Sequence, residues 1–272
     1  MADFTPPGTV NRRRLFATSF GVGALGGAWI TGLSVLARGR RPQILVVGSG
    51  SWQLLVAEHE MHRIMILAGE FEFFPEASAS HLLGVLRPRV DMVAGRQDDL
   101  DLIPAAYMRR LANPHRMVLD RATVQGDPNR TVAIGSGLDV ALGPFRIRFS
   151  PVFQGEWSSA PSPRSWLVEM AIDDVVVAIG PSLDLLARHA DARSTLAVAP
   201  SGHLAYLHRM VPNAAIMTNA ASTHGLVVAA QDENGRACRV VRTFANDVAI
   251  LEIRDGAIRV PPWTESLLLD TS

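Results

Sequence analysis

The sequence predicts an α/β protein in which two mixed sheets pack face to face with helices on their outer sides, a four-layer αββα sandwich preceded by one N-terminal signal or anchor helix. Of the 272 residues, 48% are hydrophobic and 19% are charged, which is typical of a chain with a sizeable core. After residue 41, hairpin-like strand pairs give way to strands alternating with helices, and each half must cover its own apolar face. We therefore expect three parts: residues 1–41, one domain over 42–260, and a tail over 261–272.

The N-terminal part has the layout of an export signal. Three arginines at 12–14 precede an uncharged, glycine-containing stretch over 17–37, and a cationic region followed by an apolar one is typical of such signals. Arg13-Arg14-Leu15-Phe16 resembles the twin-arginine type, with a candidate cleavage site after Ala37. The same stretch has the length of about 20 residues that a membrane anchor needs. We expect the protein to be exported, or held by this segment on the extracytoplasmic face of the bacterial cytoplasmic membrane.

The chain after the signal predicts a strand, a hairpin and then strands paired with helices. Apolar runs bounded by turn residues indicate strands, and apolar residues at helical spacing indicate helices. Expected strands are 43–48, 52–58, 63–68, 90–95 and 116–119, and expected helices are 78–86 and 103–111. His59 and His62 then lie at the tip of a hairpin, and we interpret them as solvated turn residues, because the spacing is one residue short of the zinc-protease helix motif.

The second half predicts more hairpins and then strand–helix units. Two β runs are broken by Gly143-Pro144, and a later hairpin turns at Asp173-Asp174. Expected helices follow at 183–190, 203–210 and 227–233, and expected strands at 195–199, 214–218, 239–243, 248–253 and 257–260. Cys238 is the only cysteine, which excludes an intramolecular disulfide and a Cys/His zinc cluster.

The run from Val90 to Ala105 has acidic residues at alternate positions but no histidine. Acidic residues at alternate positions after a strand have the spacing that is typical of a metal-binding turn. Asp99 and Asp101 also stand just before the helix expected from Ile103, where acidic side chains can cap free N–H groups. Capping is our preferred interpretation of these two residues.

The order of these landmarks resembles the metallo-β-lactamase fold, and within it the extracytoplasmic domain of the competence protein ComEC and its relatives. That branch has Val-Gly-Gln-Gly-Asp-Ala, Asp-Ala-Gly, Thr-His-x-Asp-x-Asp-His, Gly-Asp, Val-Pro-His-His-Gly and a late Gly-His. The matching stretches here are 47–52, 67–70, 96–105, 165–168 with 179–181, 198–202, Asn219 with 224–225, and the closing strand 255–260.

The resemblance implies a centre of one or two divalent metals, typically zinc or manganese, that this chain has largely lost. In the family, histidines occupy the positions of two residues in the acidic turn, an aspartate bridges the metals, and a further histidine precedes a helix. These positions are Gln97, Leu102, Pro181, and Pro200 or Ser201. Leucine and proline side chains cannot donate to a metal. The remaining candidate ligands are Asp99, Asp101 and His224, and we expect no cofactor.

The resemblance therefore implies a catalytically degenerate protein that acts as a binding or scaffolding module. The alternative is a metal-dependent hydrolase of the phosphodiesterase or nuclease type that keeps a reduced site. A hard ion such as Mg²⁺ or Mn²⁺, completed by water, would suit two carboxylates and one imidazole. Basic and acidic residues balance at 26 each, so net charge does not support nucleic acid as a partner. The sequence names no protein partner.

Overall fold

The computed structural model describes residues 42–49, 51–83, 89–121, 127, 130–135, 137–152, 165–190, 194–200, 214–217, 228–231, 237–242 and 248–259. The chain divides into two units, Met1–Arg40 and Arg41–Ser272, and all the described residues belong to the second. No helix within these described ranges is long and apolar enough to cross a membrane. The expected signal at 17–37 and the expected helix at 203–210 lie outside them.

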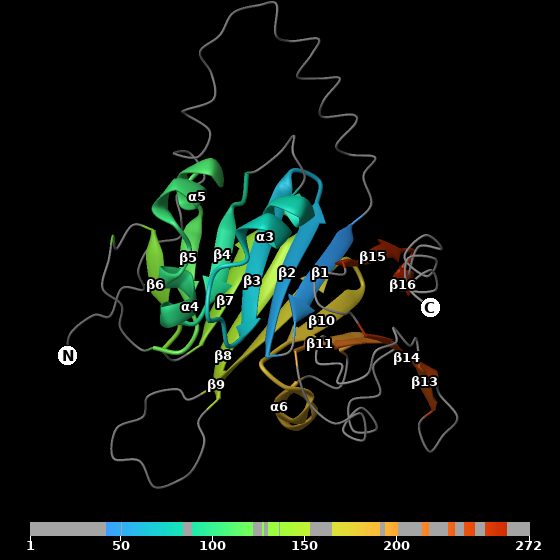
Figure 1. Ribbon diagram of the computed structural model, residues 1–272. Helices are drawn as coiled ribbons and strands as arrows, with labels where there is room; N and C mark the ends of the chain where they lie inside the picture. The colour runs from blue at the N-terminus through green and yellow to red at the C-terminus, as the bar shows by residue number, and fades with distance from the viewer. Residues whose placement is uncertain are drawn as a thin grey trace, which may run out of the picture. The chain divides into compact units, whose positions relative to one another are not determined.

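Two mixed sheets make up the described part of the chain (Figure 1). The first sheet contains β1 (Gln43–Ser49), β2 (Trp52–His59), β3 (His62–Gly69), β4 (Met92–Gly95), β5 (His115–Val118), β6 (Thr131–Ala133), β15 (Val248–Arg254) and β16 (Ala257–Arg259), in the order β16-β15-β1-β2-β3-β4-β5-β6. The second contains β7 (Leu138–Leu142), β8 (Phe145–Val152), β9 (Ser165–Ile172), β10 (Val175–Ile179), β11 (Leu196–Ala199), β12 (Ala214–Met217), β13 (Val228–Gln231) and β14 (Ala237–Arg242), in the order β13-β14-β12-β11-β10-β9-β8-β7.

Both sheets follow the same plan, antiparallel first and parallel later. In the first, β1, β2 and β3 pair antiparallel, and β3, β4, β5 and β6 pair parallel. In the second, β7 to β10 pair antiparallel, and β10, β11, β12 and β14 pair parallel. Because neighbouring parallel strands end at the same edge of a sheet, the loops after β3 and β4 lie at one edge of the first sheet. The loops after β10 and β11 lie at one edge of the second.

Three apolar cores separate the layers and establish the four-layer order. The largest joins the inward faces of both sheets, with Ile44, Leu55 and Ile66 on one side and Phe149, Trp166 and Val198 on the other. A second packs helices α3 (Glu76–Leu83), α4 (Gln97–Asp101) and α5 (Ala105–Arg110) on the outer face of the first sheet, and a third packs α6 (Leu183–His189) on the second sheet. Figure 1 shows α3, α4 and α5 in front of the first sheet and the second sheet behind it. The expected αββα arrangement of the domain is confirmed.

One helix prediction was wrong, and one short helix and one strand were missed. The helix expected over 103–111 forms as α5, and the short helix α4 before it was not predicted. The segment expected to be helical over 227–233 contains strand β13, because it pairs antiparallel with β14. Strand β6 was not predicted; its three residues complete the parallel edge beside β5.

His59 and His62 face each other across the end of the β2–β3 hairpin, as expected. They are only partly solvated, however, since their side chains are 14% and 34% exposed. The rings of His59 and Phe145 meet edge-on with their centroids 6.4 Å apart, and the ring of His62 lies against Gly143. The hairpin end is therefore packed on the second sheet.

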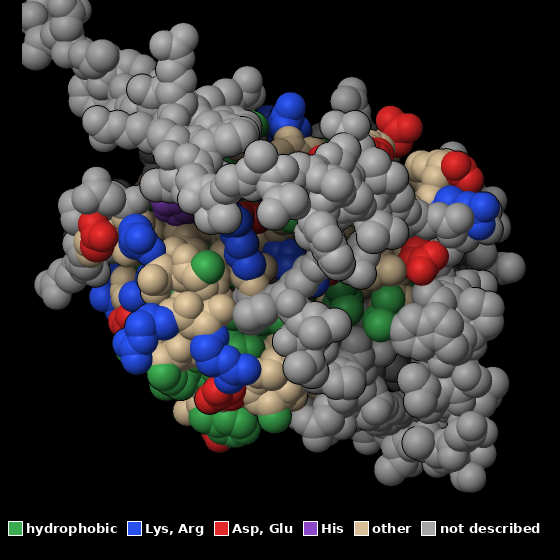
Figure 2. Space-filling model, turned by 90° about the horizontal axis from the view of Figure 1, so that it is seen from above, with side chains coloured by type: hydrophobic (Ala, Val, Ile, Leu, Met, Phe, Trp, Pro, Cys, Tyr) green, Lys and Arg blue, Asp and Glu red, His purple; other side chains and the backbone are tan. Residues whose placement is uncertain are grey.

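Figure 2 looks onto the molecule from above, and basic and acidic side chains are interspersed over the described surface there.

Candidate functional site

The acidic turn begins where β4 ends, and it folds into helix α4 instead of an open loop. Arg96 is the residue before the helix, in an extended conformation, and its own side chain makes no capping hydrogen bond. The next helix, α5, starts after Pro104 and likewise has no side-chain cap. Asp99 and Asp101 therefore do not cap a helix that begins near Ile103, and the capping interpretation was wrong. Both lie inside α4.

Asp99 is buried, with 1% of its surface exposed, and its carboxylate is fully engaged. The guanidinium of Arg96 donates from Nε to Oδ2 at 2.8 Å and from a terminal nitrogen to Oδ1 at 3.0 Å. The backbone N–H of Phe71 donates to Oδ1 at 3.3 Å. The hydrogen bond with Asp99 raises the already high pKa of Arg96 further, against the opposing effect of burial. The pair is a two-pronged ion pair that leaves neither carboxylate oxygen free.

Asp101 lies on a different side of α4 and at the surface. Its side chain is 56% exposed, and it accepts hydrogen bonds from the Gln97 amide and from Arg116, both at 2.7 Å. Partial burial raises the pKa of Asp101, but the hydrogen bonds from Arg116 and Gln97 and the nearby positive charges outweigh it, so that the pKa is below its usual range. Residues two apart on a helix do not face each other, and the two carboxylates do not converge.

Other charges around α4 are also paired. Asp98 accepts from Arg121 at 2.9 Å, and Asp120 accepts from the backbone N–H of Gln97 at 2.8 Å. Glu70 lies 3.8 Å from Arg96. The sequence interpretation missed these arginine partners. The sequence did hold a signal for these partners, since Arg96 follows the strand before the acidic turn and Arg121 follows the next strand.

The edges of the two sheets meet close to this turn. A Cβ built on Gly69, the last residue of β3, would lie 3.0 Å from the ring of Pro200 and would overlap the carbonyl oxygen of Ser51. Gly180 donates its backbone N–H to Val198 at 3.1 Å, which holds the Gly180-Pro181 turn beside the end of β11. Pro181 and Pro200 thus follow neighbouring parallel strands, and Pro200 reaches the first sheet one residue before Glu70.

The candidate ligand positions are only partly described. Gln97, Asp99, Asp101, Leu102, Pro181 and Pro200 are placed, whereas Ser201 and His224 lie outside the described residues. Leu102 is 37% exposed and offers only hydrocarbon. Among the described residues, no group of three or more His, Cys, Asp or Glu side chains could hold a metal ion. The described donor set does not fit the metal centre that the resemblance implies, because its two carboxylates diverge and each is held by an arginine.

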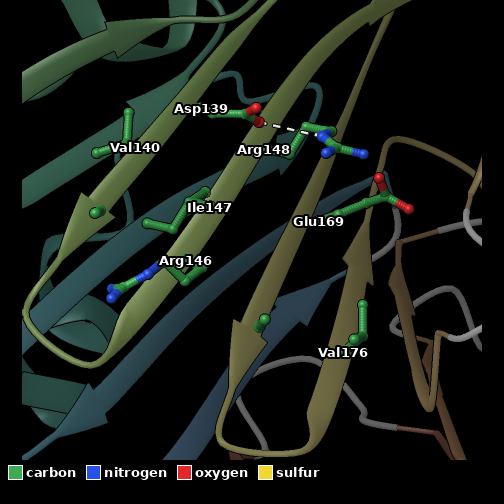
Figure 3. Close-up of a pocket in the computed structure, with 9 residues that line it drawn as sticks. Asp139, Val140, Arg146, Ile147, Arg148, Glu169 and Val176 are labelled. Carbon is green, nitrogen blue, oxygen red and sulfur yellow. Dashed lines mark hydrogen bonds and ion pairs between the residues drawn. The ribbon is translucent and has the colours of Figure 1, made fainter.

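A hollow lies on the outer face of the second sheet, away from the acidic turn (Figure 3). It has a volume of about 400 Å³ over β7, β8, β9 and β10. Arg148 donates to Asp139 at 3.1 Å, and Glu169 is the cross-strand neighbour of Arg148. Arg146 is held by the carbonyls of Gly143 and Phe145. The charged side chains that line this hollow are held by one another or by backbone carbonyls. They do not form a cluster of groups suited to catalysis.

No family model and no curated protein matches this chain. Similar solved structures include the metallo-β-lactamase fold protein YhfI from Bacillus subtilis, at 11% identity and a TM-score of 0.43, covering 65% of this chain and 86% of that one. The diiron β-hydroxylase CmlA from Streptomyces venezuelae is similar at 10% identity and a TM-score of 0.42, over 66% of this chain and 45% of that one. The Rm3 metallo-β-lactamase is similar at 13% identity and a TM-score of 0.36, over 68% of this chain and 80% of that one. Identities and TM-scores this low carry no argument about the fold. The four-layer assignment therefore depends on the sheet order and the three apolar cores.

Proposed function

We propose that this chain is a catalytically degenerate member of the metallo-β-lactamase superfamily, of the ComEC-like branch, and that it acts as a binding or scaffolding module. In this proposal the N-terminal segment exports it or anchors it at the extracytoplasmic face of the membrane. The bidentate Arg96–Asp99 ion pair carries the proposal. A carboxylate with both oxygens committed to a guanidinium has to break that pair before it can bind a metal.

Chemistry at the neighbouring positions supports the same conclusion. A zinc centre of this kind needs three or four ligands per ion from imidazole, carboxylate or thiolate groups. Leu102, Pro181 and Pro200 supply none of these. Asp101 faces Arg116 at the surface, away from Asp99.

Metal content of the purified full chain tests the proposal. After incubation with Zn²⁺ or Mn²⁺ and removal of the free ion, elemental analysis should find far less than one ion per chain. Chelation should leave the melting temperature unchanged, since a metal that binds only the folded state would stabilise it.

The hydrolase alternative makes the opposite prediction. A stoichiometric divalent ion that disappears in both Asp99→Ala and His224→Ala would establish the reduced site and end the degenerate interpretation. Loss of the ion in only one variant would still contradict the proposal, because the proposal has no ion to lose.

A further inference from the structure

Strand β7 is an edge of the second sheet that is open to another strand. It pairs with β8, and no strand in the described ranges pairs with its other side. The other sheet ends, β6, β13 and β16, have three or four residues, whereas β7 has five. Edge strands are commonly kept from pairing by short length, lysine, proline or a bulge. The sequence of β7, LDVAL, contains neither lysine nor proline, and its register with β8 is unbroken.

The end of the sandwich beside β7 carries apolar side chains. Leu138, Val140 and Leu142 are only partly buried, and they pack against the core between the sheets. A short connection joins β7 to the edge strand β6 of the first sheet, whose Val132 is 38% exposed. Val132 is the register partner of Met117, a residue of the same core, and so lies on the same face of its sheet. We call Val132, Leu138, Val140 and Leu142 the apolar rim.

The outer face of the β7–β8 hairpin carries a basic residue that has no acidic partner within the described ranges. Arg148 donates to Asp139, its cross-strand neighbour. Arg146 is the neighbour of Ala141, and it donates to two backbone carbonyls of its own hairpin. No acidic side chain in the described part of the chain pairs with it. Figure 3 shows Asp139, Arg146 and Arg148 on these two strands. Only the methyl group of Ala141 stands between Arg146 and the open edge.

The hydrogen bonds of the hairpin determine which backbone groups face the open edge. The turn between β7 and β8 has two residues, so the pair that closes it, Leu142 with Phe145, exchanges hydrogen bonds. Along an antiparallel pair, hydrogen-bonded and non-hydrogen-bonded positions alternate. The backbone N–H and C=O groups of Asp139 and Ala141 therefore point away from β8, where a further strand can accept and donate.

A second copy of β7 fits this edge in one antiparallel register. Asp139 opposite the partner's Asp139 would place like charges together, which destabilises a sheet. Ala141 opposite the partner's Ala141 would bring Asp139 to the partner's Gly143, which lies in the turn with a φ of 54° and does not continue the strand. Asp139 opposite the partner's Ala141 avoids both faults and pairs the whole strand.

We propose that the chain forms a symmetric dimer in which β7 pairs antiparallel with β7 of a second copy, with the two-fold axis at Val140. On the inner face, Val140 meets the partner's Val140 and Leu138 meets the partner's Leu142, so the apolar rim is covered. The same surface serves both subunits, which closes the assembly at two copies. The interface does not depend on the loss of the metal centre.

On the outer face, the dimer gives Arg146 the acidic partner that it lacks. The partner's Asp139 lies two strands from Arg146, about 10 Å between Cα atoms, which is twice the spacing of neighbouring strands. An extended arginine side chain reaches over Ala141 to this carboxylate. Each Asp139 is then held by Arg148 of its own subunit and by the other subunit's Arg146, so charge complementarity and apolar burial favour the same register.

The oligomeric state of the purified full chain tests the dimer. Sedimentation equilibrium in one non-ionic detergent, from micromolar to submillimolar protein, should show a monomer–dimer equilibrium. Arg146→Glu brings a second carboxylate to the partner's Asp139 and should raise the dissociation constant at least tenfold. Adding Asp139→Lys to Arg146→Glu should restore most of the affinity. Arg109→Glu makes the same charge change at an exposed position of α5 and should leave the dissociation constant unchanged.

Disulfide cross-linking tests the register, in a background in which Cys238→Ala removes the native thiol. Val140→Cys places two thiols on the two-fold axis, in a non-hydrogen-bonded pair whose Cα atoms are about 4.5 Å apart, within reach of a disulfide. Ala141→Cys is the control, because Ala141 is the more exposed residue but its two copies are offset along the strands by more than the disulfide limit of about 7 Å. Mild oxidation should link Val140→Cys much faster than Ala141→Cys.

Three results would each overturn the proposal. The first is a chain that stays monomeric at every concentration. The second is a dimer that Arg146→Glu and Arg109→Glu weaken equally, since such a dimer is held by another surface. The third is an Ala141→Cys chain that cross-links as fast as Val140→Cys, since random collision then accounts for the links. None of these outcomes depends on whether the chain binds a metal.

Discussion

At the scale of single residues, arginine has the geometry to hold a buried carboxylate by both of its oxygens. All 26 basic residues of the chain are arginine, and a guanidinium presents parallel N–H groups that match both oxygens of a carboxylate. Asp99 would otherwise be a buried carboxylate held only by the N–H of Phe71. Removing one partner of a buried pair leaves an uncompensated charge. The guanidinium of Arg96 supplies the counter-charge that the buried Asp99 requires.

The Arg96–Asp99 pair gives the first prediction. Replacing Arg96 with Met should lower the free energy of unfolding by about 3–5 kcal/mol, because the buried Asp99 loses its counter-charge. Urea unfolding of the purified domain measures the change. Arg148→Met is the matched control, since Arg148 and Asp139 are 61% and 74% exposed, and exposed pairs contribute about 0–1 kcal/mol. An equal loss of unfolding free energy in the two variants would show that the Arg96–Asp99 pair stabilises the fold no more than an exposed pair does.

Asp91 gives a prediction about pH. Burial raises its pKa, but the hydrogen bonds from His62 and from the N–H of Arg63, with the charges of His62 and Arg89, outweigh burial and hold the pKa below its usual range. The nitrogen Nδ1 of His62 lies 3.4 Å from Asp91, and the N–H of Arg63 lies 3.1 Å from it. A carboxyl whose folded pKa is depressed stabilises the fold above its unfolded pKa of about 3.9 and loses that contribution as pH falls through the folded value.

Asp91→Asn should therefore be less stable than the parent at about pH 6, by about 1–3 kcal/mol for the lost charged acceptor. The gap in unfolding free energy between the two proteins should begin to narrow below about pH 4, where the carboxyl of the unfolded chain becomes protonated, and should continue to narrow as the pH falls through the lower folded pKa. Chemical unfolding of both proteins across this range gives the result. A gap that stays constant down to acid pH would contradict the depressed pKa.

At the scale of elements, the strands were predictable and the short segments between them were not. Hairpins such as β2–β3 and β9–β10 show long apolar runs interrupted by turn residues, and they form as expected. Helix α4 has only five residues, four of them polar, so it shows no apolar periodicity. Its fold depends on partners distant in the sequence, Phe71 and Arg116. The segment at β13 favours a helix locally, but pairing with β14 decides its structure.

The contact between the β2–β3 hairpin and the β7–β8 turn gives the third prediction. A Cβ on Gly143 would overlap the ring of His62, and the residue has a φ of 54°. Gly143→Ala should cost about 1–3 kcal/mol through overpacking, in addition to the strain of the positive φ. Gly137→Ala separates the two effects, because its φ is 95° but the nearest atom to its Cβ is at 3.4 Å. Thermal unfolding should rank Gly143→Ala below Gly137→Ala, and the reverse order would rule out the contact.

At the scale of the whole molecule, the sequence located the candidate site but not the state of its residues. The absence of a donor atom at Leu102, Pro181 and Pro200 was predictable, because side-chain chemistry is visible in any sequence. The divergence of Asp99 and Asp101 was not readable, because it follows from α4 being helical and from arginines on other strands.

The N-terminal segment gives the last prediction. If Arg13-Arg14-Leu15-Phe16 is a twin-arginine signal, the double change Arg13→Lys and Arg14→Lys should retain the protein in the cytoplasm although the positive charge is kept. Arg12→Lys lies outside the pair and should leave export unaffected. The intact mass then separates the two fates: a mature chain that begins at Arg38 means cleavage after Ala37, and a full-length chain in the membrane fraction means an anchor. Full export of the double-lysine variant would reject the twin-arginine interpretation, whichever mass is found.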